Sequence, residues 1–324
     1  MSVKHDHLIV SAAPHVNAPQ DTASIMRDVC IALVPALIWA IYIFGFRALL
    51  LTVVCVAASV FFEWLVRKIM GRDPMTILDW SAAVTGMILA FNLPVSIPYW
   101  MAIVGCFVAI VIVKQLFGGL GQNFANPAIV GRIALFIGFA GQMSNWTVTS
   151  KMSPVITGAA GVDAVAGPTP LGLYTQGAEV PEFIDMFLGK INGSMGEISS
   201  VLLIVGGLYL MFKHVISPAI PVSYLATVAV LSLCFGRNPL FDLCAGGVML
   251  GAFFMATDYV TSPITTKGKI IFGIGCGLFT MLIRQFGAYP EGASFAILLM
   301  NILTPHIDNW TKHKIHGAEE GGKK

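Results

Sequence analysis

Long runs of apolar residues follow one another along most of the chain, separated by short stretches that contain polar residues, Gly or Pro. A helix needs about 20 predominantly apolar residues to cross a bilayer, whereas a strand of a transmembrane barrel needs about 10 that alternate in polarity. The runs here are continuous, so they predict an all-α integral membrane protein. We expect about ten transmembrane helices, near residues 29–46, 48–66, 80–91, 97–117, 126–142, 198–213, 218–235, 240–256, 269–285 and 293–307.

Two of these runs are interrupted. The third, 80–91, is too short to cross a bilayer alone and ends at Asn92-Leu93-Pro94, and the eighth runs into Thr257-Asp258. Broken backbone at membrane depth persists only where protein or a polar cavity satisfies its hydrogen-bonding groups. We therefore expect discontinuous helices at both places.

A weak internal symmetry relates the first five runs to the last five. The third run of each set is interrupted, and each fifth run opens with a Pro and small residues, Asn126-Pro127-Ala128 and Pro290-Glu291-Gly292-Ala293. Five is odd, so the two sets would cross the membrane in opposite orientations. Such inverted repeats place ligand and ion sites near the discontinuous helices. The alternative is a chance match in a Gly-rich membrane protein.

The distribution of Lys and Arg predicts the orientation. Thirteen of these residues fall on the side of the two termini and five on the other, and one lies within a run. By the positive-inside rule, both termini are expected to be cytoplasmic. The resulting division is a cytoplasmic N-terminal segment 1–28, a first five-helix repeat 29–142, an extracytoplasmic loop 143–197, a second repeat 198–310 and a cytoplasmic tail 311–324.

The composition excludes several classes of protein. Hydrophobic residues make up 56% of the 324 residues and charged residues 11%, whereas charged residues average about 25% in soluble domains. A soluble globule could not bury so much apolar surface, and a disordered or nucleic-acid-binding chain would need more charge. Residues 1–24 lack the features of a signal peptide, and no phosphate-binding Gly motif or His-rich metal motif indicates a soluble catalytic domain.

Charged side chains within or beside the runs are costly in a membrane and therefore mark sites or ion pairs. Glu63, Lys114 and Arg284 lie near the ends of runs, where we expect them to reach the interface or cap helices.

Asp258 and Glu291 stand beside the interruptions in corresponding places of the two halves, which favours a polar site. They are our candidates for a cation pathway, because hard cations take oxygen ligands. For Asp258, a helix cap or a contact with Lys267 is the alternative.

Two loops carry unusual sequences. Residues 118–128 read Gly-Gly-Leu-Gly-Gln-Asn-Phe-Ala-Asn-Pro-Ala, so a helix N-terminus is flanked by the amides of Asn123 and Asn126. Such an arrangement can bind an anionic or carbonyl-rich ring, or it is simply a tight turn. In the loop 143–197, Thr169 stands in a Gly/Pro turn six residues after Asp163. Its hydroxyl is chemically able to accept a phosphoryl-linked group, although the residues alone indicate a turn.

Three motifs resemble the RnfD/NqrB family of membrane flavoproteins. They are Asn126-Pro127-Ala128 in the Gly-rich turn, the stretch Phe254-Met-Ala-Thr-Asp-Tyr-Val-Thr-Ser-Pro263, and the stretch Tyr289-Pro-Glu-Gly-Ala-Ser-Phe-Ala-Ile-Leu-Leu-Met-Asn301. The similarity covers residues from about 25 to 310, and the last two motifs are highly specific. About 28 residues precede the first run, which favours the RnfD branch, because NqrB chains are typically longer there.

The resemblance implies two flavins. In this family, a Thr in a motif of the type Asp-x-x-Ser/Thr-Gly-Ala-Thr carries FMN through a phosphoester bond, and the matching position is Thr169, with Asp163 and Gly167 also matched. The chain departs from the motif at Ala166 and Pro168. A noncovalent riboflavin is also implied, and Asn123 and Asn126 are our candidates for it on chemical grounds.

The resemblance also implies a function. The chain would be a flavin-carrying subunit of an ion-translocating ferredoxin:NAD oxidoreductase (Rnf) complex, relaying electrons coupled to Na⁺ or H⁺ transport and not catalytic alone. Its partners would be the other membrane and peripheral subunits, a flavin transferase and the lipid bilayer of a prokaryotic inner membrane, with no nucleic acid. The alternatives are the NqrB subunit of a sodium-translocating NADH:quinone reductase, or a flavin-free solute channel or transporter.

Overall fold

A computed structural model describes residues 21–72, 78–146, 168–189, 191–197, 199–287 and 291–312. The regular elements of this described part are helical throughout, which confirms the predicted all-α class. The first group comprises α1 Thr22–Phe44, α2 Phe46–Ile69, α3 Ser81–Phe91, α4 Tyr99–Phe107, its π-helical continuation η2 Val108–Gln115, α5 Pro127–Gly138 and α6 Ala140–Met143. The remainder comprises α7 Pro170–Thr175, α8 Phe183–Leu188, α9 Ser200–Phe212, α10 Ala219–Cys234, α11 Pro239–Cys244, α12 Val248–Leu250, the π-helical η3 Gly251–Met255, α13 Thr266–Phe286 and α14 Ala293–Thr311.

Each apolar run expected from the sequence contains a helix. Among the described helices, α1, α2 and α13 are long and apolar enough to cross a membrane by themselves, and the other apolar helices are shorter. Helix α1 begins at Thr22 rather than near 29, because Asp21 caps it: its carboxylate accepts a 2.7 Å hydrogen bond from the Thr22 N–H, and Ser24 completes a capping box.

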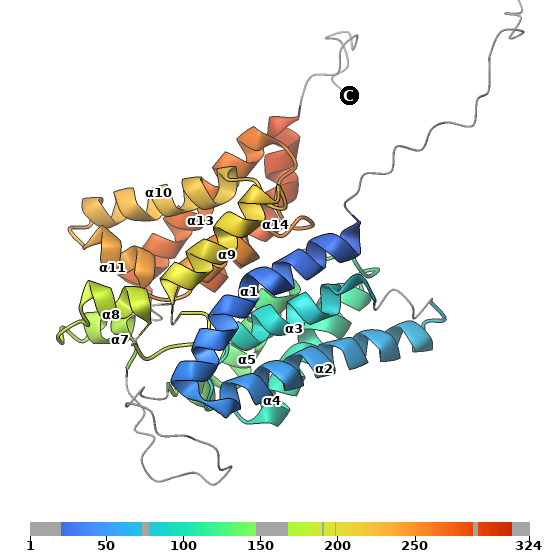
Figure 1. Cartoon of the computed structure of the whole chain (residues 1–324). Coiled ribbons are helices and arrows are strands. Elements are labelled where there is room, and N and C mark those ends of the chain that lie inside the picture. Colours follow the sequence, from blue (N-terminus) through green and yellow to red (C-terminus); the bar gives the residue numbers. More distant parts are fainter. Residues whose placement is uncertain are drawn as a thin grey trace, which may run out of the picture.

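Figure 1 shows two groups of helices side by side. The first contains α1 to α5 and the second α9 to α14, and they meet where α1 packs against α9 and α5 against α14. The short helices α7 and α8 lie at one end of the bundle, with α8 against α11. Helix α1 begins, and α14 ends, toward the opposite end of the bundle.

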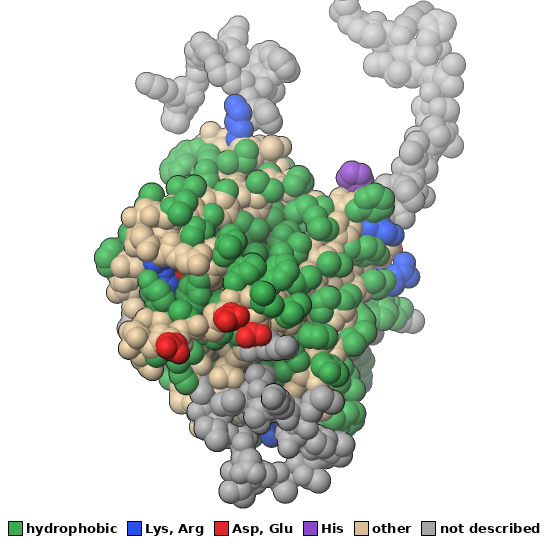
Figure 2. Space-filling model, turned by 60° about the vertical axis from the view of Figure 1, so that its left-hand side comes forward, with side chains coloured by type: hydrophobic (Ala, Val, Ile, Leu, Met, Phe, Trp, Pro, Cys, Tyr) green, Lys and Arg blue, Asp and Glu red, His purple; other side chains and the backbone are tan. Residues whose placement is uncertain are grey.

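The outer surface is largely apolar. Figure 2 shows a face covered by hydrophobic side chains, with few Lys, Arg, Asp or Glu among them. Large side chains such as Ile38, Phe212 and Leu233 are well exposed on α1, α9 and α10. Contiguous apolar surface of this extent marks contact with a membrane or with other proteins, so it agrees with the predicted membrane location.

The predicted interruption of the third run is confirmed. Helix α3 ends at Phe91, and its backbone continues without helix to Pro98. The guanidinium of Arg47, at the start of α2, donates hydrogen bonds to the carbonyls of Val95 (2.8 Å) and Ser96 (2.9 Å). This side chain supplies donors that the broken helix lacks.

The eighth run is divided more finely than the sequence suggests. A single helix over 240–256 is wrong, because α11, α12 and η3 replace it, and Gly246 adopts a positive φ of 66° between the first two. Arg284 of α13 donates 2.6 Å hydrogen bonds to the carbonyls of Asp242 and Ala245 at this break. Both interrupted runs are therefore held by a buried or half-buried Arg from a neighbouring helix.

Candidate functional site

A pocket that is partly open to the outside lies between the two groups of helices. Most of the wall is apolar and comes from α1, α3, α9, η3 and the segments beside them. The polar side chains that reach it are Ser81, Thr85, Lys114, Asn123, Asn126, Thr257 and Asp258.

The Gly-rich turn places its two amides in this pocket. Gly118, Gly119 and Gly121 have φ angles of 129°, 103° and 88°, a region that other residues adopt only with strain. These glycines let the chain reverse between η2 and α5, so that Asn123 and Asn126 face the pocket, where the sequence analysis expected a ring to bind.

Both amides also hold local structure. The Asn126 side-chain oxygen caps α5 by accepting a 3.0 Å hydrogen bond from the Ala128 N–H, and its nitrogen donates to the Met255 carbonyl at 3.2 Å. The Asn123 nitrogen donates to the Ala125 carbonyl at 3.0 Å. Polar atoms of the two side chains are thus fixed in position before any ligand arrives.

Asp258 closes the turn that follows η3. Its carboxylate accepts a 3.2 Å hydrogen bond from the Thr261 hydroxyl, and its carbonyl accepts one from the Ser262 N–H at 3.1 Å. Burial raises the pKa of this carboxyl, against the opposing effects of hydrogen bonds and of Lys114. Among the described residues no ion pair joins Asp258 to Lys267. The structure thus places Asp258 at the pocket, while its role with a cation stays a prediction.

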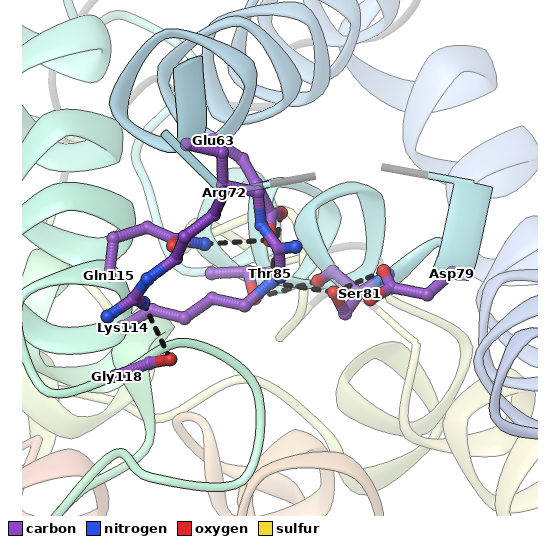
Figure 3. A network of polar contacts seen from close by, with 9 residues as sticks. Glu63, Arg72, Asp79, Ser81, Thr85, Lys114, Gln115 and Gly118 are labelled. Atoms are coloured by element: carbon purple, nitrogen blue, oxygen red, sulfur yellow. Dashed lines mark hydrogen bonds and ion pairs between the residues drawn. The ribbon is translucent and has the colours of Figure 1, made fainter. Parts of the chain in front are cut away.

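A buried ionic network borders the pocket, and its members Ser81 and Lys114 are part of the lining (Figure 3). Lys114 of η2 donates to the Glu63 carboxylate of α2 at 2.9 Å and to the Ser81 hydroxyl of α3 at 2.6 Å. Gln115 donates to the other Glu63 oxygen at 2.8 Å, and the Ser81 hydroxyl donates to Asp79. The network connects α2, α3 and η2 and holds the ammonium group of Lys114 beside the pocket.

A second network lies toward the other end of the bundle, at the break between α11 and α12. Arg237 donates to the two oxygens of Asp242 at 2.9 and 2.8 Å, and the Ser232 hydroxyl donates to the same carboxylate at 2.6 Å. Arg284 approaches Asp242 at 3.6 Å. A carboxylate on α11 therefore joins the end of α10 to the end of α13.

The expectation that Glu63, Lys114 and Arg284 reach the membrane interface is wrong. These residues are 0%, 2% and 4% exposed, respectively, so they do not reach an interface. Arg284 does cap a helix, because it donates to the carbonyls of Asp242 and Ala245 at the end of α11. Each has an opposite charge nearby within the protein, which offsets the cost of leaving water. Their spacing along the chain, across separate helices, gave no signal of this pairing.

Glu291 is also paired, with Arg132 from the middle of α5. Arg132 donates further hydrogen bonds to the Asn92 side-chain oxygen (3.2 Å) and to the Ser294 hydroxyl (2.6 Å). The group joins the end of α3, the middle of α5 and the start of α14, where the two halves of the bundle meet. Arg132 thus holds Glu291 in place, and the role of Glu291 in a cation pathway stays a prediction.

Thr169 is the N-cap of α7, and the residue is 6% exposed. Its hydroxyl oxygen accepts a 3.2 Å hydrogen bond from the Gly172 N–H. Asp163 and Gly167, the other matched positions of the motif, lie outside the described residues. Nearby, the Arg237 guanidinium lies 4.1 Å from the centre of the Tyr174 ring, so aromatic and cationic groups border this helix.

The chemistry at Thr169 fits a phosphoester. An ester oxygen keeps lone pairs, so the hydrogen bond from the Gly172 N–H would persist if FMN were attached there. Modification removes only the donor function of the hydroxyl. Because Thr169 is 6% exposed, a transferase could reach its hydroxyl only if the N-cap opened.

Comparison with known proteins identifies the family to which the chain belongs. Residues 9–317 match the model of the NQR2, RnfD, RnfE family. The chain belongs to this family. The resemblance found in the Asn126 turn and in the motifs around Asp258 and Glu291 is thereby confirmed.

Three relatives align along almost their whole length, and each is the subunit designated D in its complex. The chain is 49% identical over 316 residues to that of the Na(+)-translocating ferredoxin:NAD(+) oxidoreductase complex of Acetobacterium woodii, with 96% of each chain covered. It is 44% identical over 327 residues to that of the proton-translocating ferredoxin:NAD(+) oxidoreductase complex of Clostridium ljungdahlii, again with 96% of each covered. The relative from the ion-translocating oxidoreductase complex of Stutzerimonas stutzeri is 38% identical over 329 residues, covering 92% of this chain and 93% of the relative.

Proposed function

We propose that this chain is the RnfD subunit of an ion-translocating ferredoxin:NAD oxidoreductase complex and carries flavin within the membrane. Relatives with the corresponding designation align over nearly the full chain. The observation that carries the flavin assignment is that Asn123, Asn126 and Lys114 all line a pocket whose wall is mostly apolar. Such a cavity suits a flat, largely apolar ring with a carbonyl-rich edge.

The protein residues have distinct tasks in this proposal. Asn123 and Asn126 hold the polar edge of a riboflavin ring, and the apolar wall excludes water from it. Lys114, held by Glu63, keeps a positive charge beside the ring. Thr169 anchors FMN through its hydroxyl oxygen at the start of α7. A bound flavin supplies the electron chemistry, and the protein supplies position and electrostatics.

The helix arrangement supports two inverted five-helix repeats. Corresponding helices meet across the middle, first with first (α1 and α9) and fifth with fifth (α5 and α14). Each half also has a polar network that joins its second, third and fourth runs. The residues are Glu63, Ser81 and Lys114 in one half and Ser232, Asp242 and Arg284 in the other. The two networks lie toward opposite ends of the bundle, as inversion requires.

The orientation in the membrane follows from the charge distribution. Both ends of the chain would face the cytoplasm of a prokaryotic cell, and the segment with Thr169 would lie outside the inner membrane. The exposed apolar side chains of the helices would contact lipid and the other subunits of the complex. A flavin transferase would act on Thr169 from the outer side.

Thr169→Val tests the covalent flavin. After coexpression with a flavin transferase, the denatured wild-type chain should fluoresce in a gel, because the phosphoester survives denaturation. Thr169→Val should abolish the fluorescence. Thr175→Val is the matched control, since it removes a hydroxyl from the end of the same short helix and should leave the fluorescence unchanged. Persisting fluorescence in Thr169→Val would show that FMN is attached elsewhere.

The whole complex, purified after correct maturation, tests the rest of the assignment. A second flavin should be released from it by denaturation and identified by chromatography. A complex without any flavin absorbance would favour the flavin-free channel or transporter instead.

A further inference from the structure

A short non-helical segment enters the region between the two halves of the bundle. The Gly196 N–H donates a 2.7 Å hydrogen bond to the Phe91 carbonyl at the end of α3. A Cβ on Gly196 would lie 2.6 Å from the Leu250 side chain of α12, so the backbone of this segment touches both interrupted runs. Glu197 follows directly and is 3% exposed.

The carboxyl group of Glu197 is incompletely satisfied. Its Oε1 atom is buried and has no hydrogen-bond partner among the residues that the structure describes. Ser194 supplies hydrogen bonds to the group. A buried carboxylate oxygen without a donor is costly as an anion, and one proton removes that cost.

Charges of both signs face Glu197. Its Oε1 and the Nη1 atom of Arg132 each lie 3.9 Å from the position that a Cβ on Gly247 would take. Arg132 from α5 and Arg284 from α13 favour the anion, while burial and Glu291 before α14 favour the neutral acid. The balance raises the pKa of Glu197 to about 8.

The neighbours of these groups are fixed by their own contacts. Arg284 is held by the Asp242 carboxylate, and Arg132 is held by Glu291. Loss of the Glu197 proton would leave Arg132 facing two carboxylates, and its return would leave one. The charge state of Glu197 is therefore coupled to the contact between α5 and the start of α14.

We propose that Glu197 is a site of reversible proton binding at the junction of the two halves. Sodium is a poorer occupant, because a hard cation needs several oxygen ligands and a guanidinium faces this carboxyl group instead. The site also neighbours the proposed flavin loop: a Cβ on Gly246 would lie 2.8 Å from the Leu171 side chain and 3.0 Å from Arg284. The use of this proton in ion transport rests on the proposed function, whereas its binding does not.

Infrared spectroscopy of the full chain in its purified complex tests the binding. The carbonyl stretch of a protonated carboxyl group should disappear as the pH rises from about 6 to about 10, because the pKa values of buried carboxyl groups can lie in this range. Glu197→Gln should remove this band. Glu179→Gln, at an exposed position of the same connecting region, should leave it unchanged. A band that persists in Glu197→Gln, or a wild-type spectrum without a titrating band, would overturn the proposal.

Gly247→Ala separates proton binding from a merely structural role. Its methyl group would stand in ordinary contact with both Arg132 and Glu197, and the Gly247 φ of −75° accommodates Ala. By preventing closer approach of the guanidinium, it should move the midpoint of the infrared titration to higher pH. Gly138→Ala, whose Cβ would touch nothing within 4 Å, should leave the midpoint unchanged. Equal midpoints in both variants, or a midpoint that moves when Na⁺ replaces K⁺, would also overturn the proposal.

Transport in vesicles that hold the whole complex tests the use of the proton. Glu197→Gln should lower the number of ions moved per electron while ferredoxin-dependent NAD reduction continues with an uncoupler present. An unchanged ratio would remove Glu197 from the transport path. If the chain were a flavin-free channel, the infrared titration would still occur but no electron flow would depend on this protein, so the two failures are distinguishable.

Discussion

The Glu63–Lys114 pair should dominate the stability of the first half of the bundle. Glu63→Gln keeps the shape of the side chain but removes its charge. Lys114 would then keep only uncharged acceptors, namely the Ser81 hydroxyl at 2.6 Å and the new amide oxygen. Removing one partner of a buried ion pair costs about 3–5 kcal/mol. We therefore expect the folded-to-unfolded ratio to fall by about a hundredfold or more.

Removing Lys114 instead of the Glu63 charge should lower the free energy of unfolding by less. In Lys114→Met, the Glu63 carboxylate keeps its 2.8 Å hydrogen bond from Gln115 and the Arg67 guanidinium at 3.5 Å. The double variant Glu63→Gln/Lys114→Met should be more stable than the sum of the single changes predicts, by about 1–3 kcal/mol.

Equilibrium unfolding in detergent micelles, followed by circular dichroism, measures these differences. Arg72→Gln is the control, because Arg72 is exposed and donates to the Gly118 carbonyl at 2.8 Å; its effect should stay within about 0.5 kcal/mol. Additive single effects would refute the reasoning, since they would mean that Glu63 and Lys114 do not interact in the folded protein.

Three further predictions concern the pocket and the membrane. Asn123→Leu should reduce the noncovalent flavin recovered from the purified complex while leaving the fluorescence of covalent FMN intact, because Asn123 lines the pocket and Thr169 lies on another element; equal loss of both flavins would contradict separate sites. Asp258→Asn should lower ion transport per electron with FMN still attached if Asp258 takes part in a cation pathway, and an unchanged ratio of ²²Na⁺ or H⁺ to electrons in vesicles would exclude it. Gln176→Cys, in a chain without its native Cys residues, should react with an impermeant thiol reagent in intact cells; labelling only after lysis would reverse the proposed orientation.

The sequence was sufficient for features that depend on local patterns. Continuous apolar runs predicted where the helices lie, and Pro94 predicted the end of α3, because both follow from the chemistry of adjacent residues. The Gly-rich turn was recognised for the same reason, and Gly118, Gly119 and Gly121 do adopt positive φ angles.

Features that depend on contacts between distant residues could not be predicted from the sequence. Glu63 and Lys114 lie on separate helices and looked like end-of-run charges until the fold brought them together. Glu197 lies in a polar stretch with Gly and Ser, a composition typical of an exposed loop. In the structure the backbone of Gly196 contacts the end of α3, so Glu197 is buried between the two halves. Gly246 divides the eighth run through a backbone angle that one Gly among many does not reveal.

Arg47 and Arg284 become available to the interrupted runs at different stages of translation. Arg47 precedes α3 in the chain, so the carbonyls of Val95 and Ser96 can find their donor as soon as that segment leaves the ribosome. Arg284 follows the break between α11 and α12 by about forty residues, so the carbonyls of Asp242 and Ala245 must wait for α13. Unsatisfied backbone is costly in lipid. We therefore expect the first half to settle in the bilayer during translation, whereas the second half stays vulnerable to quality-control proteases until α13 has been inserted.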